Sequence, residues 1–346
     1  MKPLIIALAL ILAAPTTAYA HPRPPRDLRQ LAHQHGIKIG SAVDIAALRA
    51  ESDYRRTLNR EFTHVTAENA MKWESVEPER GVFTWADADA LVENARRNHQ
   101  QVRGHTLVWH NQLPAWLTSG VADGSIDAGE LRSILRDHIT TQVRRYKGKI
   151  RAWDVVNEVV EEDGTMRQSI WLTHLGPGYI ADAFRWAHRA DPRAKLFIND
   201  YNLEWNAPKI ETTLALVKEL QASGVPIHGA GFQGHLGIQY DYPGDWPNIM
   251  RRFADLGLEI AITELDVRME LPVTAEKLAR QADYYSRALT GCLGVKACRE
   301  LTVWGYTDRH SWVPGWFAGE GSACLLDENL APKPAYHALL AVKSPR

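Results

Sequence analysis

Trp153-Asp154-Val155-Val156-Asn157-Glu158 is a largely apolar, β-branched run that stops abruptly at an Asn-Glu pair. Such a run predicts a buried strand of a parallel sheet. A second run of this kind, Glu259-Ile260-Ala261-Ile262-Thr263-Glu264, also stops on a glutamate. Because the strands of a parallel barrel end on one shared face, we expect both carboxylates at the same barrel mouth.

Strand-like runs recur along the chain at residues 37–43, 62–67, 101–109, 150–157, 195–199, 229–233, 258–263 and 301–304. Between them, residues 131–143, 180–190 and 208–223 have the apolar spacing of amphipathic helices. This alternation favours an α/β fold, a single (β/α)8 TIM barrel. An open doubly wound sheet is the alternative, but it would need a Gly-rich phosphate loop after its first strand. Gly40-Ser41-Ala42-Val43 is not such a loop.

The chain has 346 residues and 45% hydrophobic content, which suits one catalytic domain over residues 21–346. Residues 1–20 predict a signal peptide, because Lys2 precedes an apolar run and Ala18-Tyr19-Ala20 offers small residues for cleavage. The run is too short for a permanent membrane anchor. We therefore expect a secreted or periplasmic protein with no membrane attachment after cleavage, and a monomer. A net charge of −1 with no basic patch argues against nucleic-acid binding.

Cysteine usage agrees with export. Cys292 and Cys298 enclose a short loop, so a local disulfide is expected, with two unrelated thiols as the alternative. Cys324 is left over, and we expect it to be a buried thiol. No Cys/His spacing resembles a zinc site.

Polar or tryptophan side chains follow seven of the eight predicted strands. This is the pattern of a functional rim, since active sites of TIM barrels lie at the carboxyl ends of the strands. The residues concerned are Glu68, Asn69, His105, Asn157, Glu158, Asn199, Gln233, His235, Glu264 and Trp304.

Two glutamates that face each other are the apparatus of glycoside hydrolysis. We interpret Glu158 as the general acid/base and Glu264 as the nucleophile, against the alternative of exposed loop acids. Asn157 is placed to hydrogen-bond a sugar 2-hydroxyl, and His235 and Asp266 are candidates to hold the charge and orientation of Glu264.

Further residues suit sugar recognition. Glu68, Asn69 and Lys72 form a donor and acceptor cluster for vicinal hydroxyls. Aromatic faces stack on pyranose rings, although ordinary packing is the alternative for each tryptophan. The aromatic candidates are Trp109, Trp304, Trp312 and Trp316.

Metal-dependent hydrolysis is the competing chemistry for a barrel that carries His105 and His110. The one His-x-His, His33-Gln34-His35, precedes the first strand and so lies at the opposite face, where we expect a helix terminus. We expect no metal and no cofactor, and assign His105, His110 and Gln233 to sugar binding or to support of the carboxylates.

These motifs together resemble the family 10 glycoside hydrolases, the endo-β-1,4-xylanases. The matching segments are residues 67–73 (AENAMKW), 103–110 (RGHTLVWH), 153–158 (WDVVNE), 199–202 (NDYN), 231–236 (GFQGHL), 262–266 (ITELD) and 302–305 (TVWG). The resemblance implies that Glu158 is the acid/base and Glu264 the nucleophile, and that Cys292 and Cys298 form the family's local disulfide. It also implies sugar-contacting or supporting roles for Glu68, Asn69, Lys72, His105, Trp109, Asn157, Gln233, His235, Trp304 and Trp312. Gly176-Pro177-Gly178-Tyr179 departs from the family, which often has an acidic residue before the tyrosine.

Three functions compete at this point. The first is a retaining endo-xylanase that acts on xylan or xylo-oligosaccharides. The second is a barrel glycosidase that acts on glucan or galactan with the same two glutamates. The third is an inert sugar-binding barrel, which is disfavoured because both glutamates are present.

Overall fold

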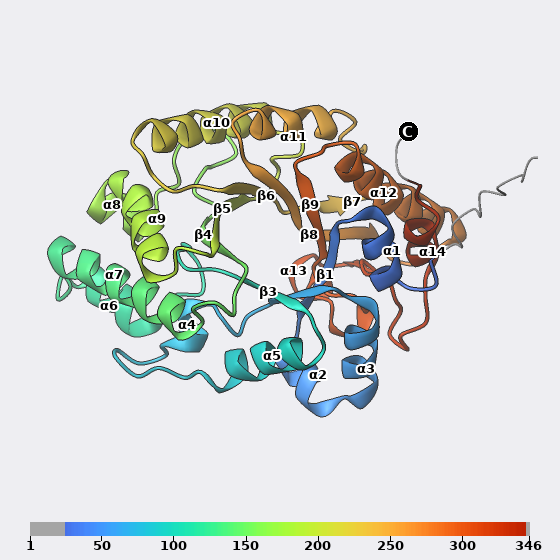
Figure 1. The fold of residues 1–346 in the computed structure, drawn as a ribbon, viewed down its shortest axis with the longest axis horizontal. Helices are drawn as coiled ribbons and strands as arrows, with labels where there is room; N and C mark the ends of the chain where they lie inside the picture. Colours follow the sequence, from blue (N-terminus) through green and yellow to red (C-terminus); the bar gives the residue numbers. More distant parts are fainter. Residues whose placement is uncertain (1–24, 344–346) are drawn as a thin grey trace, which may run out of the picture.

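Eight parallel strands close into a barrel in the computed structural model, which describes residues 25–343 (Figure 1). The expected signal peptide, residues 1–20, lies outside the described residues. Neighbouring strands pair in the order β8-β6-β5-β4-β3-β2-β1-β9, and pairing of β8 with β9 closes the ring, which confirms the TIM barrel. The barrel strands are β1 (Lys38–Val43), β2 (His64–Ala67), β3 (Gln101–Gly104), β4 (Ala152–Asn157), β5 (Lys195–Asp200), β6 (Gly229–Phe232), β8 (Glu259–Glu270) and β9 (Cys298–Val303).

Helices surround the barrel and bury their apolar faces against it (Figure 1). They are α1 (Leu28–His35), α2 (Ile45–Ala50), α3 (Ser52–Glu61), α4 (Trp73–Val76), α5 (Ala86–Arg97), α6 (Ala115–Ala122), α7 (Ala128–Arg145), α8 (Ile170–Leu175), α9 (Gly178–Ala190), α10 (Ala207–Ala222), α11 (Trp246–Ala254), α12 (Ala275–Leu293) and α14 (Pro334–Leu340). A 3-10 turn η1 (Asp308–His310) and a short helix α13 (Val313–Trp316) lie in the loop after β9. The three helices predicted from spacing are α7, α9 and α10. Across the described residues, no helix is both long and apolar enough to cross a membrane.

Local sequence explains where the helices begin and end. Asn206 caps α10, because its side chain accepts the Lys209 amide hydrogen and Pro208 follows in the first turn. Gly36, with a φ of 65°, ends α1 in the left-handed conformation. His33 and His35 therefore lie in the last turn of a helix that precedes the barrel, as the sequence predicted.

The third strand is shorter than predicted. We expected it over residues 101–109, but β3 ends at Gly104. The indole of Trp153 in β4 fills the space beside Gly104, where a Cβ atom would lie 2.1 Å from the ring. The chain then continues along β4 without regular pairing, and Leu107 N donates to Asp154 O over 3.0 Å. His105 and Trp109 are thus loop residues, free of the alternation a strand would impose.

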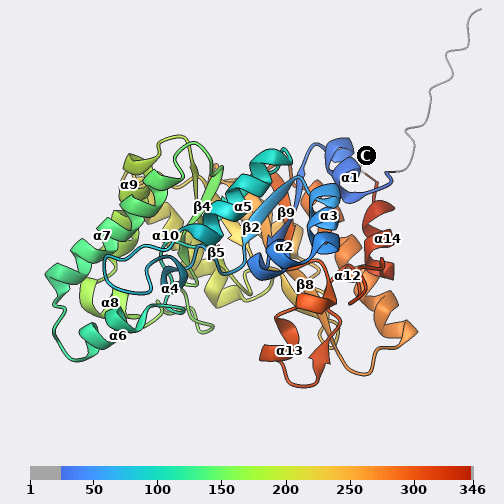
Figure 2. The same ribbon diagram turned by 90° about the horizontal axis from the view of Figure 1, so that it is seen from below.

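The seventh barrel strand is longer than predicted. We expected it to end at Glu264, but β8 continues to Glu270. Its pairing with β9 shifts between Ile262 and Leu265. The extension then pairs with the short strands β7 (His235–Gly237) and β10 (Glu320–Gly321), which satisfies its backbone hydrogen-bonding groups outside the barrel. In Figure 2, α13 lies beyond the end of β8, on the side away from α1.

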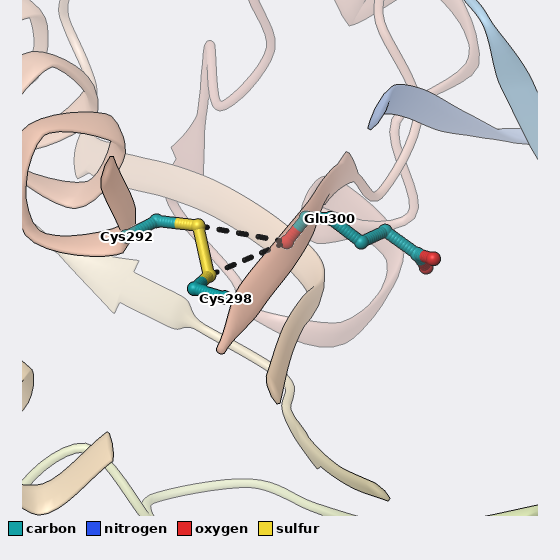
Figure 3. Close-up of a disulfide and its surroundings, with 3 residues drawn as sticks. All are labelled: Cys292, Cys298 and Glu300. Atoms are coloured by element: carbon teal, nitrogen blue, oxygen red, sulfur yellow. Dashed lines mark hydrogen bonds between the residues drawn. A yellow bond between two sulfur atoms is a disulfide. The ribbon is translucent and has the colours of Figure 1, made fainter. Parts of the chain in front are cut away.

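The predicted disulfide is present. Cys292 near the end of α12 is bonded to Cys298 at the start of β9, with their Cα atoms 5.3 Å apart (Figure 3). Both sulfurs pack near the Glu300 carbonyl, at 3.8 and 3.9 Å from its oxygen, while the Glu300 carboxylate points away from them (Figure 3). Cys324 is a buried free thiol, as predicted.

Candidate active site

Glu158 is the first residue after β4, and an unusual backbone conformation sets the direction of its side chain. Its φ is 55°, a left-handed value that costs a non-glycine residue about 1–3 kcal/mol. Neighbouring groups hold it there. Glu158 N donates to Asn199 O over 2.9 Å, and Arg167 Nε donates to the Glu158 carbonyl oxygen over 2.6 Å. The two peptide units that flank the Glu158 Cα are therefore both held by hydrogen bonds.

Two donors orient the Glu158 carboxyl group. Trp109 Nε1 donates to Oε2 over 2.8 Å, and Gln233 Nε2 donates to Oε1 over 3.1 Å. His110 lies nearby, but its Nδ1 is 3.9 Å from Oε2, which is beyond hydrogen-bond distance. The structure thus brings Trp109 and Gln233 into direct contact with Glu158, and His110 only beside it.

Glu264 lies deeper in the mouth, with 4% of its surface exposed. Asn199 Nδ2 donates to Oε1 over 2.9 Å, and His235 Nε2 lies 3.2 Å from Oε2. Thr263 Oγ1 donates to Asn199 Oδ1 over 2.7 Å, which fixes the amide so that its NH2 group faces Glu264. The same NH2 group donates to Asn157 Oδ1 over 2.8 Å. Asn157 and Glu264 therefore share one donor.

His235 lies between two carboxylates. Its Nδ1 is 2.9 Å from Asp266 Oδ2, and Trp312 Nε1 donates to the same oxygen over 2.7 Å. Burial favours the neutral ring, but Asp266 and Glu264 outweigh it and raise the pKa of His235 to about 10. His235 is then an imidazolium, and both ring nitrogens donate.

The charge of Glu264 is stabilised in return. Burial alone would raise the pKa of this carboxyl, but the His235 hydrogen bond, the His105 and His235 rings and the Asn199 amide lower it to about 2. Glu264 is thus a carboxylate at every pH at which the protein is expected to work, which is the form a nucleophile needs.

A buried ion-pair network lies below the mouth and holds His105. His105 Nδ1 is 3.0 Å from Asp154 Oδ2. Arg103, which is fully buried, donates to both Asp154 oxygens at 3.1 and 2.5 Å and to Glu300 Oε1 at 3.1 Å. The bidentate geometry fixes Asp154, and so the ring of His105. The edge of His105 also contacts Trp304, with ring centroids 5.2 Å apart.

The predicted cluster after β2, Glu68, Asn69 and Lys72, lies next to Trp109. Lys72 Nζ donates to Asn69 Oδ1 over 3.0 Å and lies 5.0 Å from the centre of the Trp109 ring. Burial and the Asp44 carboxylate raise the pKa of Glu68 to about 7, although the Lys72 charge opposes them. Burial lowers the pKa of Lys72, against the attraction of Glu264 and Glu68. Gln112 completes this cluster, because its Oε1 accepts from Lys72 Nζ over 2.7 Å.

The tryptophans around the mouth differ in exposure. Trp304 is buried, Trp312 is half-buried and Trp316 is 69% exposed. The rings of Trp312 and Trp316 are 6.3 Å apart. Trp304 packs against the rings of His105 and His235, Trp312 packs against the ring of His235, and Trp316 is the exposed member of the set.

The sequence did not single out several residues that complete the site. Asn199 was noted as a strand end and as part of a segment that resembles the family, but it was given no role, and Gln112 gave no signal. Arg103 and Asp154 did carry a signal, since a charged residue within a run predicted to be a buried strand needs a buried partner. Among the described residues, no group of three or more His, Cys, Asp or Glu side chains could hold a metal ion.

Comparisons with known proteins identify the family of the chain. Residues 27–342 match the family described as Glycosyl hydrolase family 10. An endo-1,4-beta-xylanase of Agaricus bisporus is 46% identical over 316 residues, which cover 90% of this chain and 93% of that protein. Endo-1,4-beta-xylanase B of Thermotoga neapolitana is 42% identical, with 96% and 95% covered. The crystal structure of xylanase 10B from Thermotoga petrophila RKU-1 in complex with xylobiose superposes with a TM-score of 0.88 at 42% identity, covering 93% of this chain and 98% of that one. The family match spans the whole barrel, and the chain therefore belongs to glycosyl hydrolase family 10.

Proposed function

We propose that this protein is an endo-1,4-β-xylanase that hydrolyses internal bonds of xylan with retention of anomeric configuration. The observation that carries the proposal is the hydrogen-bonded set that links the two glutamates. Gln233 contacts Glu158 and Asn157, and Asn199 contacts Asn157 and Glu264. Two carboxylates held by one network at a barrel mouth suit a double displacement, which requires them about 5–5.5 Å apart. The names of the relatives support xylan as the substrate.

In the first step, Glu264 attacks the anomeric carbon while Glu158 protonates the departing glycosidic oxygen. The negative charge of Glu264 is secured by His235 and Asn199, so the nucleophile needs no proton removal. Trp109 and Gln233 fix the direction in which Glu158 presents its proton. A glycosyl ester with Glu264 forms, and the leaving chain departs.

In the second step, Glu158 is a carboxylate and removes a proton from water. The water oxygen attacks the anomeric carbon from the face that the leaving chain vacated, which breaks the bond between that carbon and Glu264 and releases the Glu264 carboxylate. Asn157 assists both steps. Its Oδ1 already accepts from Asn199 and Gln233, so its NH2 group is available to donate to the sugar 2-hydroxyl. This hydrogen bond strengthens as positive charge develops at the neighbouring carbon.

The remaining residues support binding of the sugar chain. We assign Glu68, Asn69, Lys72 and His105 to hydroxyl recognition, with His110 beside the acid/base. Trp304 and Trp312 would form apolar walls for the ring at the cleavage site. We further propose that residues 21–346 are one catalytic domain, and that the chain is exported with residues 1–20 as its signal and acts as a monomer.

Product analysis tests the proposal. Digestion of soluble xylan should give xylo-oligosaccharides of several lengths from the earliest times, with little release from carboxymethylcellulose in parallel. Proton NMR of fresh digests should show the β-anomer first. Equal rates on both polymers would overturn the substrate, and initial α-anomer would overturn the mechanism.

A further inference from the structure

A buried carboxylate outside the mechanism, Glu204, lies in the loop between β5 and α10. It is 2% exposed, whereas its neighbour Trp205 in the same loop is 57% exposed. A carboxylate is expensive to bury without a partner. Neither Glu158 nor Glu264 contacts it directly, so it has no part in the chemistry described above.

The contact of Glu204 explains its position. Its Oε1 accepts the Gly234 amide hydrogen over 2.7 Å. Gly234 has a φ of 78°, a conformation suited to glycine, and apolar side chains enclose it. A Cβ atom there would lie 3.3 Å from both Ile262 and Trp246. The Glu204 carboxylate therefore fixes a backbone amide in a tightly packed, apolar place.

Gly234 joins two residues that contact the two proposed catalytic carboxylates. Gln233 donates to Glu158 over 3.1 Å, and His235 lies 3.2 Å from Glu264. A shift of the Gly234 peptide would move both contacts together. Gln233 N is itself anchored to Asp200 O over 3.0 Å, at the end of β5, so the loop with Glu204 and the segment after β6 are adjacent.

We propose that Glu204 is a positioning residue that, through the Gly234 amide, sets the orientation of both Glu158 and Glu264. The inference rests on the proposed function, since it concerns the same reaction. The 2.7 Å between Gly234 N and Glu204 Oε1 is at the short end of the range for N–H···O hydrogen bonds, which suits a contact whose purpose is to hold geometry. Displacement of a reacting group by about 1 Å can cost about 100-fold in rate, even when the change lies away from the chemistry.

Two variants of Glu204 distinguish the loss of its hydrogen-bond acceptor from the loss of its charge. Glu204→Leu removes the acceptor at similar volume, and Glu204→Gln keeps a carbonyl oxygen that can accept the Gly234 amide. We expect E204L to lower kcat on xylan about 100-fold with KM changed by less than about threefold. We expect E204Q to stay within about threefold of wild type. The loss in E204L should be smaller on an activated aryl xylobioside, because that substrate needs orientation of Glu264 but no proton from Glu158.

Glu61 supplies a matched control. It is also a buried carboxylate, 3% exposed, and it accepts a backbone amide hydrogen from Leu28 over 3.1 Å, at α1 rather than at the mouth. Glu61→Leu should lower the melting temperature and leave kcat within about twofold of wild type. If E204L does not fold, Glu204→Asp replaces it, because a side chain one methylene shorter should lose the contact and the rate in the same way.

The outcomes are distinct. Wild-type kcat in a folded E204L or E204D overturns the inference, and so does an E204Q variant that loses as much activity as E204L, since the charge rather than the acceptor would then matter. A kcat loss in E61L equal to that in E204L would reduce the effect to general destabilisation. A wild-type protein without xylanase activity would instead contradict the proposed function.

Discussion

The side-chain amide of Asn199 donates a 2.9 Å hydrogen bond to Oε1 of Glu264, although 65 residues separate the two in the chain. The pairing of β5 with β6 and of β6 with β8 brings them together across the barrel interior. The other hydrogen of the same NH2 group goes to Asn157 Oδ1. One amide thus couples the proposed nucleophile to the residue that precedes the proposed acid.

Replacement of Asn199 by Ala should lower kcat about 10- to 100-fold, because a hydrogen bond to a charged group is worth about 1.5–3 kcal/mol. Steady-state kinetics on an aryl xylobioside would measure the loss. Asn94→Ala is the control, since Asn94 Nδ2 makes a 2.9 Å amide contact with Asn59 between two helices of the outer layer. Equal kcat values for N199A and wild type would show that His235 alone suffices to hold Glu264.

Replacement of Glu158 by Ala should spare the first step on a substrate with a good leaving group, because that group departs without a proton. The covalent intermediate should accumulate, and added azide should release it as a β-glycosyl azide. Glu264→Ala removes the nucleophile, so the intermediate should not form, and azide could at most give product of opposite configuration. Chromatography and NMR of the azide products distinguish the two variants. Equal losses in both variants, without azide rescue in either, would contradict the assigned roles.

The charged pair of His235 and Glu264 should stabilise the folded protein fully only within a defined pH range. The pKa of His235 is raised from 6.5 to about 10. Its contribution to the free energy of unfolding is therefore fully present below pH 6.5 and is lost as the pH rises to 10. The pKa of Glu264 is lowered from 4.5 to about 2, so its contribution is fully present above pH 4.5 and is lost as the pH falls to 2. Both contributions are complete between pH 4.5 and 6.5.

Melting temperatures of wild type and His235→Asn across pH 5–10 would measure this effect. The difference between the two proteins should be largest at pH 5–6.5 and should shrink steadily towards pH 10. Titration of the His235 ring by NMR should show an imidazolium at pH 8. A ring that titrates near pH 6.5 would contradict the ion pair.

Removal of the disulfide by Cys292→Ala and Cys298→Ala should lower the free energy of unfolding by roughly 2 kcal/mol, the loop-closure value for a sequence separation of 6. The activity at 25 °C should not change. The disulfide joins α12 to the start of β9, and Trp304 lies at the opposite end of that strand. Urea unfolding with and without reductant would measure the difference, and Cys324→Ala controls for loss of a thiol. A double variant as stable as wild type would show that packing alone holds this loop.

The sequence by itself determined the barrel and its two glutamates. Strand and helix signals are local, since apolar periodicity depends on residues a few positions apart. Glu158 and Glu264 were found because each directly follows an apolar run, and the disulfide because its cysteines are close in the chain. These features need no knowledge of which strands are neighbours.

Only the tertiary structure decided the hydrogen-bond partners. Asn199, Arg103 and Glu204 act on residues that barrel closure and strand register bring within reach, and neither closure nor register is encoded in a local pattern. The continuation of β8 past Glu264 has the same origin, because its partners β7 and β10 come from distant segments. Local periodicity fixed where the carboxylates lie along the chain, and long-range packing fixed the groups that set their charge and direction.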